Sequence, residues 1–253
     1  MRPLQIWYNG REVKNMDQFS RTELLLGTDG VARLKRARVA VFGVGGVGGY
    51  VAEALIRSGV GAIDLFDNDT VSLTNLNRQI IALHSTIGRD KTEVMAERLK
   101  DINPDAVITA RRMFYLPETA DEVDLSAYDF IVDAVDTVAA KLELVKRATA
   151  GNIPIISAMG AGNKLDPSKL CITDISKTHT CRLAKVMRVE LRRRGIEHLT
   201  VAYSTEQPIP AKVESEEQPT GARRSVPGST AFVPACMGLM IAAHVVKVLG
   251  EKE

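Results

Sequence analysis

Short apolar runs alternate with segments of helical periodicity along the first two thirds of the chain. The apolar runs lack the polar alternation of a half-exposed strand, which is typical of parallel strands buried on both faces. They occupy 39–42, 62–66, 128–134 and 153–158. Apolar residues at helical spacing fill 47–55, 91–100 and 138–148. Strands that alternate with helices predict an α/β fold on a doubly wound, mainly parallel sheet.

The remaining segments are expected to flank this core. Residues 1–36 would form an N-terminal segment with two helices, 17–26 and 31–35, separated by glycines. Residues 159–253 would form an irregular, substrate-facing half. In this half the sequence predicts a turn-rich loop at 160–167, a basic helix at 180–194, a strand at 200–204 and a mobile loop at about 206–228. No linker or repeat separates these parts, so residues 1–253 are predicted to form one domain.

The apolar stretch 231–249 approaches the length of a membrane span. It contains Pro234, His244 and Lys247, and its flanks lack the charges expected beside a span. We therefore expect a helix buried against the sheet, and no membrane partner.

Glycines follow the first apolar run at positions 43, 45, 46 and 48. Gly43, Gly45, Gly46 and Gly48 would allow a tight turn that brings backbone N–H groups to a phosphate at a helix N-terminus. Asp67 follows the second run, about where an acidic residue binds a ribose hydroxyl. Residues 37–158 are therefore predicted to be a Rossmann-like nucleotide-binding core, which by itself also suits an NAD-dependent oxidoreductase.

Polar residues after Asp67 favour a triphosphate over a dinucleotide. They are Asn75, Asn77, Arg78, Gln79 and Lys91. Arg78 could grip phosphate oxygens with two N–H groups, while Lys91 would act as a compact charge at a helix start. Without the surrounding motif, Arg78 and Lys91 would be interpreted as solvated surface charges.

Asp136 is expected to end a strand at the carboxyl edge of the sheet, where ligands bind in open α/β folds. A carboxylate there could hold Mg²⁺ together with phosphate oxygens. It could equally cap the helix that begins near residue 137. Asp133 lies earlier in the same run, on a face that the pattern does not define.

Composition narrows the class of protein. The 253 residues are 45% hydrophobic and 25% charged, which is ordinary for a soluble globular protein. A formal charge of +2 neither indicates nor excludes binding to nucleic acid. The three scattered cysteines form no CxxC pair and fit a reducing cytoplasm. Cys181 could be a nucleophile with His179 nearby, but a single cysteine before a helix is more often not catalytic.

The glycine motif, Asp67, the Asn75-x-Asn77-Arg78-Gln79 run and Lys91 together resemble the ATP site of E1-like adenylating enzymes. This resemblance implies an ATP cofactor, a metal ion held by Asp136, and a homodimer in which Arg21 reaches the phosphates of the neighbouring subunit. Sulfur-carrier adenylyltransferases of this superfamily usually carry two CxxC pairs for zinc, and this chain has none.

The second half is similar to the tRNA threonylcarbamoyladenosine dehydratases. The similarity runs from about Phe19 to the C-terminus and rests on residues 131–136, on Gly160-Ala-Gly162 with Asp166-Pro167, on residues 173–178, and on Tyr203-Ser-Thr-Glu206. It implies ATP-dependent activation of the threonyl carboxylate, followed by ring closure without an enzyme nucleophile. It also implies a tRNA partner, and leaves open a monovalent cation and a sulfur-relay protein. Candidate tRNA contacts are Arg188, Arg192, Arg193, Arg194, Arg223 and Arg224, each of which could equally be solvated.

Three alternatives remain at this point. The nearest is an adenylyltransferase that activates the Gly-Gly terminus of a ubiquitin-like sulfur carrier. The others are an NAD-dependent oxidoreductase and a nucleotide-binding scaffold without turnover. The complete set of phosphate-binding residues argues against the scaffold.

Overall fold

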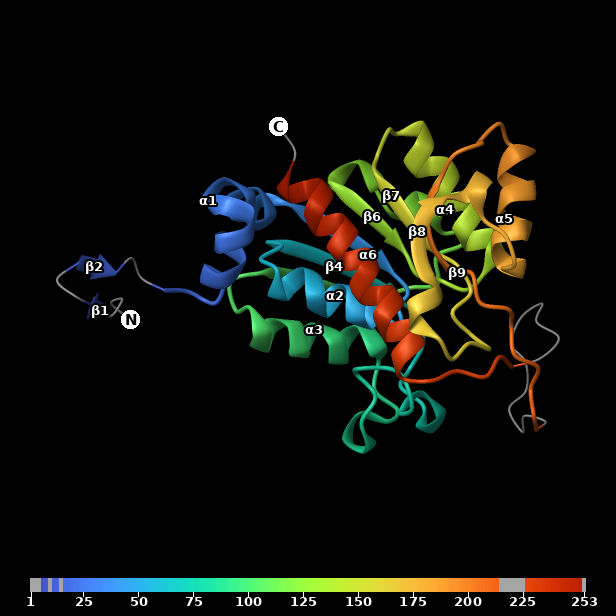
Figure 1. Cartoon of the computed structure of the whole chain (residues 1–253), viewed down its shortest axis with the longest axis horizontal. Coiled ribbons are helices and arrows are strands. Elements are labelled where there is room, and N and C mark those ends of the chain that lie inside the picture. Colours follow the sequence, from blue (N-terminus) through green and yellow to red (C-terminus); the bar gives the residue numbers. More distant parts are fainter. Residues whose placement is uncertain (1–5, 9–10, 14–15, 214–225, 252–253) are drawn as a thin grey trace.

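The computed structural model describes residues 6–8, 11–13, 16–213 and 226–251 (Figure 1). Within these residues, seven strands form one sheet in the order β5-β4-β3-β6-β7-β9-β8. The strands are β3 (Arg38–Phe42), β4 (Ala62–Asp67), β5 (Val107–Arg112), β6 (Phe130–Asp133), β7 (Ile155–Ala158), β8 (Leu170–Asp174) and β9 (Thr200–Ser204). All neighbours pair in parallel except β8, which runs antiparallel to β9. The predicted doubly wound, mainly parallel sheet is therefore confirmed.

Six α-helices lie within the described residues. They are α1 (Ser20–Arg36), α2 (Gly48–Arg57), α3 (Lys91–Ile102), α4 (Val138–Ala150), α5 (Arg182–Arg192) and α6 (Phe232–Gly250). The two helices expected at the N-terminus lie within α1, which is broken at Gly27, where φ is 70° and ψ is 167° and the backbone is not helical. A separate hairpin of β1 (Ile6–Tyr8) and β2 (Arg11–Val13) precedes it. Part of the expected mobile loop, residues 214–225, lies outside the described residues.

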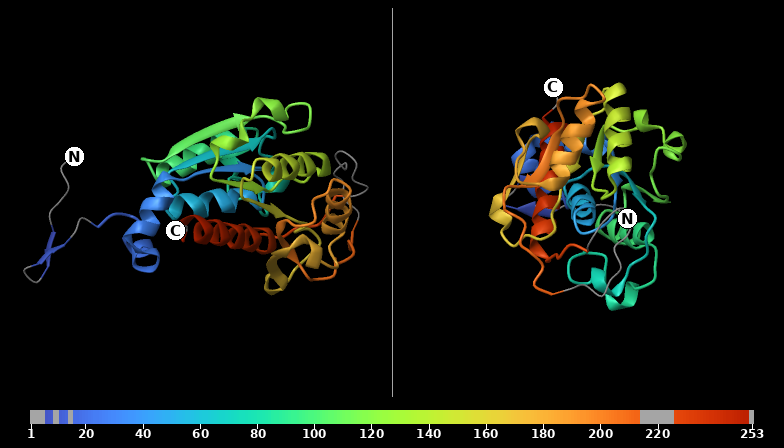
Figure 2. Two further views of the ribbon diagram at one scale, coloured as in Figure 1. Left: turned by 90° about the horizontal axis from the view of Figure 1, so that it is seen from above. Right: turned by 90° about the vertical axis from the view of Figure 1, so that its right-hand side faces the viewer.

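Helices cover both faces of the sheet (Figure 2). On one face, Val39 and Val41 of β3 pack in a single apolar cluster with residues of α2, α3 and α6. On the other face, Ala40 and Phe42 pack with the inner side of α4. The outer side of α4 packs in turn against α5. Alternate residues of β3 thus enter two different cores, which explains why its sequence is apolar throughout.

The apolar C-terminal helix α6 is, within the described residues, the one helix long and apolar enough to cross a membrane by length and composition. It packs instead against α2 and α1, and Ile241 and Val245 are fully buried (Figure 1). The expected packing of this helix within the core is confirmed.

The order of the strands reverses between β3 and β6. From β3 the chain adds β4 and β5 on one side, and then returns to place β6 and β7 on the other. In open α/β sheets, ligands bind outside the carboxyl ends of the strands at this reversal. The turn after Phe42 and the loop after Asp133 therefore mark the expected place of the site.

Candidate nucleotide-binding site

The turn between β3 and α2 is closed so tightly that two of its glycines leave no room for a side chain. A Cβ atom on Gly43, which has a φ of 91°, would lie 2.6 Å from the carbonyl oxygen of Ala134. A Cβ atom on Gly48 would lie 1.8 Å from the carbonyl oxygen of Gly43. The turn therefore closes on itself and against the loop that follows β6. This holds the N-terminus of α2 at the reversal point, where its amides can meet an anion.

The middle of the turn is open. A Cβ atom on Gly45 would meet only the side-chain nitrogen of Gln79, at 4.0 Å. One on Gly46 would lie 3.5 Å from Cγ of Arg78 and 3.4 Å from Cβ of Pro234 in α6. The structure thus brings Arg78 and Gln79 to the glycine turn, as the sequence predicted, and adds the start of α6 as a third wall.

Further along, α6 packs directly on the first residues of α2. A Cβ atom on Gly238 would lie 2.5 Å from the carbonyl oxygen of Val47 and 2.9 Å from Cβ of Tyr50. Only a glycine permits this approach of the two helices. The position of the glycine turn therefore depends on α6 as well as on β3 and α2.

Asp67, the last residue of β4, is largely buried beside the turn. Its carboxylate accepts hydrogen bonds from the backbone N–H groups of Val44 (2.7 Å) and Asp69 (2.9 Å). Burial raises the pKa of Asp67 above its ordinary value, against the opposing effects of Lys91 and these two amides. Because the carboxylate ties β4 to the glycine turn, it lies where a ribose beyond the phosphates would reach it.

Lys91 begins α3 and is almost fully buried, with a relative exposure of 6%. Its ammonium group lies 2.7 Å from Oδ2 of Asp69 and 3.9 Å from Oδ1 of Asp67. Asp90 is the N-cap of α3, but its carboxylate contacts Arg112 rather than the helix. The ammonium of Lys91 is thus held beside the ribose-binding candidate, on the same side of the turn.

The loop after β4 supplies the other predicted residues. Asn75 is buried and closes a capping box with Ser72, so its role here is to shape the loop. The guanidinium of Arg78 donates to the carbonyl oxygen of Thr74 and to Oδ1 of Asn77, both at 2.9 Å. The amide nitrogen of Asn77 donates to the carbonyl oxygen of Ser229 (3.0 Å).

Gln79 has a buried amide oxygen without a hydrogen-bond partner among the described residues. An unsatisfied buried acceptor is costly and commonly marks a place where a ligand or water belongs. Together with the open turn at Gly45 and Gly46 and the two cations, this fits a polyphosphate ligand that carries hydrogen-bond donors on a sugar or coordinated water.

Asp136 differs from the sequence expectation in its setting. Strand β6 ends at Asp133, so Asp136 does not end the strand but lies in the exposed loop between β6 and α4. The N-cap of α4 is Thr137, which corrects the alternative of a capping role for Asp136. Within the described ranges no three His, Cys, Asp or Glu side chains cluster as metal ligands. A metal at Asp136 would therefore need oxygens from a bound nucleotide.

A buried ionic network that the sequence did not predict lies directly beneath this loop. The ammonium of Lys141, on α4, donates to Oδ2 of Asp133 (3.0 Å), Oγ of Ser157 (3.1 Å) and the carbonyl oxygen of Ala158 (2.7 Å). Lys141, Asp133 and Ser157 are all fully buried. Asp133 also accepts from the backbone N–H of Val135 (3.3 Å) and from the hydroxyl of Ser157.

All three N–H donors of Lys141 are thus used, and they tie the ends of β6 and β7 together. The loop after β6 packs on the glycine turn, and the loop after β7 begins the substrate-facing half. A lysine eight positions after an aspartate, inside an apolar helical segment, is the only signal in the sequence that could have suggested this pair.

Arg21 is not brought to the site within one chain. It is exposed on α1, and the ring of Phe19 beside it would lie 3.4 Å from a Cβ atom on Gly59. Gly59 follows the C-terminal end of α2, whereas the glycine turn lies at the N-terminal end, about 15 Å away for a ten-residue helix. Figure 1 shows α1 at the opposite end of the molecule from the loops of the site.

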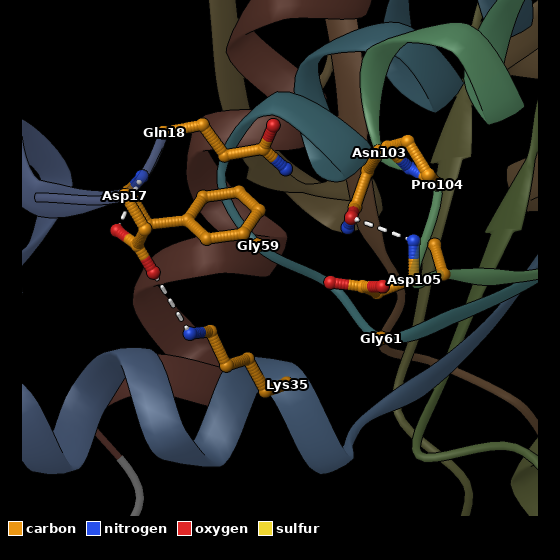
Figure 3. A pocket seen from close by; sticks show the side chains of 10 residues that line it. Asp17, Gln18, Lys35, Gly59, Gly61, Asn103, Pro104 and Asp105 are labelled. Atoms are coloured by element: carbon orange, nitrogen blue, oxygen red, sulfur yellow. Dashed lines mark hydrogen bonds and ion pairs between the residues drawn. The ribbon is translucent and has the colours of Figure 1, made fainter. Parts of the chain in front are cut away.

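A cavity of about 450 Å³ lies at this opposite edge (Figure 3). Phe19 lines it together with Lys35, Asn103 and Asp105, and an ion pair between Lys35 and Asp17 closes one side. None of the predicted site residues line this cavity, which lies at the amino ends of β4 and β5.

Cys181 is buried at the start of α5, and its thiol lies close to Gly160, 3.6 Å from a Cβ atom placed there. The His179 ring is exposed and its Nδ1 contacts Oγ1 of Thr180 at 2.8 Å. Among the described residues the structure therefore shows no hydrogen bond that would activate the thiol, and the nucleophile hypothesis gains no support.

Nearly the whole chain is similar to known proteins. The ThiF family matches residues 19–253. The tRNA threonylcarbamoyladenosine dehydratase of Bacillus subtilis is 46% identical over 238 residues, covering 91% of this chain and 94% of that protein. The crystal structure of the Escherichia coli tRNA N6-threonylcarbamoyladenosine dehydratase in complex with ATP superposes with a TM-score of 0.81 at 32% identity, covering 92% of this chain and 93% of that one. The complex of the same enzyme with AMP gives 0.84 at 32% identity, with coverages of 94% and 97%.

Proposed function

The chain belongs to the ThiF family, and from this premise we propose that it catalyses the ATP-dependent dehydration of threonylcarbamoyladenosine in tRNA to the cyclic form. The observation that carries the proposal is the 46% identity to a dehydratase over 91% of this chain. A second support is the superposition on a related dehydratase that was crystallised with ATP and with AMP. These two nucleotides are the cofactor and one product expected of an adenylating reaction.

The reaction removes one oxygen from the threonyl carboxylate. A carboxylate oxygen attacks the α-phosphate of ATP, and pyrophosphate leaves. The carbamoyl group of the same nucleoside then attacks the activated carbonyl carbon, and the ring closes as AMP leaves with the carboxylate oxygen. The lost proton passes to solvent or to a leaving phosphate. Both attacking groups belong to the substrate, so no enzyme nucleophile is needed.

The residues of the site divide this work. The amides of residues 43–48 cradle phosphates at the start of α2, and Asp67 binds the ribose. Arg78 and Lys91 bind the phosphates and stabilise the charge that develops on the departing pyrophosphate. The unsatisfied amide oxygen of Gln79 accepts a hydrogen bond from a donor on the ligand. Asn75 and Asn77 set the shape of the loop.

We place Mg²⁺ at Asp136. Mg²⁺ is usually bound by one or two carboxylates together with phosphate oxygens and water. The exposed carboxylate of Asp136 beside the glycine turn fits this mode of coordination. When bound, the metal would neutralise phosphate charge. A bound monovalent cation and a sulfur-relay partner have no support among the described residues and stay outside the proposal.

We also propose a homodimer in which Arg21 completes the site of the neighbouring subunit. Arg21 shares a helical turn with Leu24 and Leu25, whose relative exposures of 85% and 87% are unusual for apolar side chains. Burial of these leucines against a second copy would place Arg21 at the subunit interface. There it could reach the site of the neighbouring subunit, although it lies far from the site of its own chain. We place the enzyme in the cytoplasm, where its free cysteines would stay reduced.

Mass analysis of nucleosides tests the function. tRNA that carries threonylcarbamoyladenosine is incubated with enzyme and ATP and digested, and the modified nucleoside is expected to lose one water only when ATP is present. Arg78→Ala should abolish this loss without lowering the unfolding midpoint. Arg89→Ala is the matched control, because Arg89 is exposed and forms an ion pair with Glu97 on the surface. An active Arg78→Ala enzyme would contradict the phosphate assignment.

Two further arms separate the alternatives. Pyrophosphate exchange triggered by a Gly-Gly-ended carrier protein, without any change in the nucleoside, would identify a sulfur-carrier adenylyltransferase instead. Mixing Arg21→Ala with Arg78→Ala protein tests the dimer, because only a mixed dimer contains one site with both arginines. If mixing restores no activity although the two proteins exchange subunits, Arg21 does not act across the interface.

A further inference from the structure

Helix α5 has one buried face and one exposed face. Ala184, Met187 and Leu191 are fully buried against α4 and β9. The exposed face consists of Arg182, Lys185, Val186, Val189 and Arg192, and we call it the outer face of α5. Its two valines are 45% and 44% exposed, so no element of the described chain covers it.

The positive charges of α5 are not equivalent. Arg188 is turned inward and donates to the backbone carbonyl of Thr178 (2.9 Å) and to its hydroxyl. Arg193 and Arg194 are both paired with Glu190, at 2.7 and 2.8 Å. These three arginines, which the sequence suggested as tRNA contacts, are therefore already engaged within the fold. Arg223 and Arg224, suggested with them, lie outside the described residues.

The three cations of the outer face have no such partners. Within the described part of the chain, no carboxylate lies within ion-pair distance of Arg182, Lys185 or Arg192. They span ten helical positions, which is about 15 Å. A row of unneutralised cations of this length matches the closely spaced charges of a nucleic-acid backbone.

The outer face also begins beside the site. Cys181, the N-cap of α5, lies against Gly160 in the loop that follows β7 at the carboxyl edge of the sheet. From there α5 runs back toward the amino end of β9, which follows it in the chain. Figure 1 shows α5 at the same end of the molecule as the substrate-facing loops. An RNA whose modified base enters the site could therefore extend along α5.

We propose that the outer face of α5 binds the sugar-phosphate backbone of the tRNA stem next to the modified nucleoside. The proposal rests on the proposed function and adds the surface that holds its substrate. Arg182, Lys185 and Arg192 contact phosphates, while Val186 and Val189 pack against ribose. The face carries no aromatic side chain and no hydrogen-bonding amide, so it positions the RNA without reading its sequence.

The test compares two double variants of one helix. Lys185→Ala with Arg192→Ala removes two unpaired cations, and Arg193→Ala with Arg194→Ala removes two that are paired with Glu190. Both change the net charge equally and leave the nucleotide site intact. The measurements are the Kd for tRNA at several salt concentrations, the KM and kcat for modified tRNA, and the KM for ATP.

The first double variant should bind tRNA on the order of 10-fold more weakly, and its salt slope should fall by about 1 to 2. Its KM for tRNA should rise while kcat and the KM for ATP stay near those of the unsubstituted enzyme. The control pair should change the Kd less than about threefold. Equal effects of the two pairs, or no effect of the first, would overturn the proposal. Unsubstituted enzyme that fails to dehydrate the tRNA would instead refute the proposed function, so the two failures are distinguishable.

Discussion

Replacing Lys141 with methionine tests whether the buried ionic network holds the two halves of the site together. Methionine is unbranched and one atom shorter than lysine, and it leaves the Asp133 carboxylate fully buried without its cation. Breaking a buried pair in this way costs roughly 3–5 kcal/mol. For a chain of this size, 1 kcal/mol shifts the Tm by about 2–4 °C, so the Tm should fall by roughly 6–20 °C.

Urea and thermal unfolding measure the loss, with Lys146→Met as the matched control. Lys146 is on the same helix and pairs with Glu143, but its side chain is 60% exposed. Surface pairs contribute about 0–1 kcal/mol, so this control should change the Tm by only a few degrees. Adding Asp133→Asn to Lys141→Met should recover part of the loss, because it removes the isolated charge. If Lys141→Met is no less stable than Lys146→Met, the reasoning is refuted.

Two other expectations follow from single positions. Gly48→Ala should abolish ATP binding in a filter or calorimetric assay, because its Cβ would lie 1.8 Å from the backbone oxygen of Gly43. As a control, Gly45→Ala should fold normally, because the nearest atom to its Cβ is a side-chain nitrogen at 4.0 Å. Normal ATP binding by Gly48→Ala would show that the turn is not rigid. Burial, followed by Lys247, lowers the pKa of His244 below its ordinary 6.5, so protonation favours the unfolded chain and stability is lost as the pH falls through 6.5 toward the folded pKa. The urea midpoint should therefore drop between pH 7.5 and 5.5, and His244→Gln should show a smaller drop; parallel profiles would contradict this.

The fold was predictable where local pattern and topology agree. The buried runs, the glycines and the acid after β4 each follow from the chemistry of a parallel sheet at its reversal point. Strand β8 was missed because Leu170–Asp174 mixes apolar and polar residues at an antiparallel edge, where the rule of continuous apolar strands does not hold. The glycines before residue 31 correctly indicated a break, because the backbone of α1 is not helical at Gly27.

Side-chain roles were predictable only for residues next to a backbone signal in the sequence. Lys141 lies in an apolar helical segment and Arg188 in a basic one, yet Lys141 is fully buried and Arg188 donates to the backbone of Thr178. Their partners are set by packing between elements, which no local pattern encodes. The expected position of Asp136 at the end of the strand was wrong by a small margin, since β6 ends at Asp133, three residues before it.

The packing of α6 on the start of α2 has a consequence for how the protein is made. The ribosome releases β3, the glycine turn and α2 early, but the helix whose Gly238 fits against Val47 is synthesised only after residue 231. Until α6 arrives, the apolar side of α2 that it covers faces water. The nascent chain thus contains the glycine turn before the helix that positions this turn has been made. It also exposes an apolar surface to which chaperones could bind. Nucleotide binding should therefore arise only after α6 has been synthesised and has packed on α2.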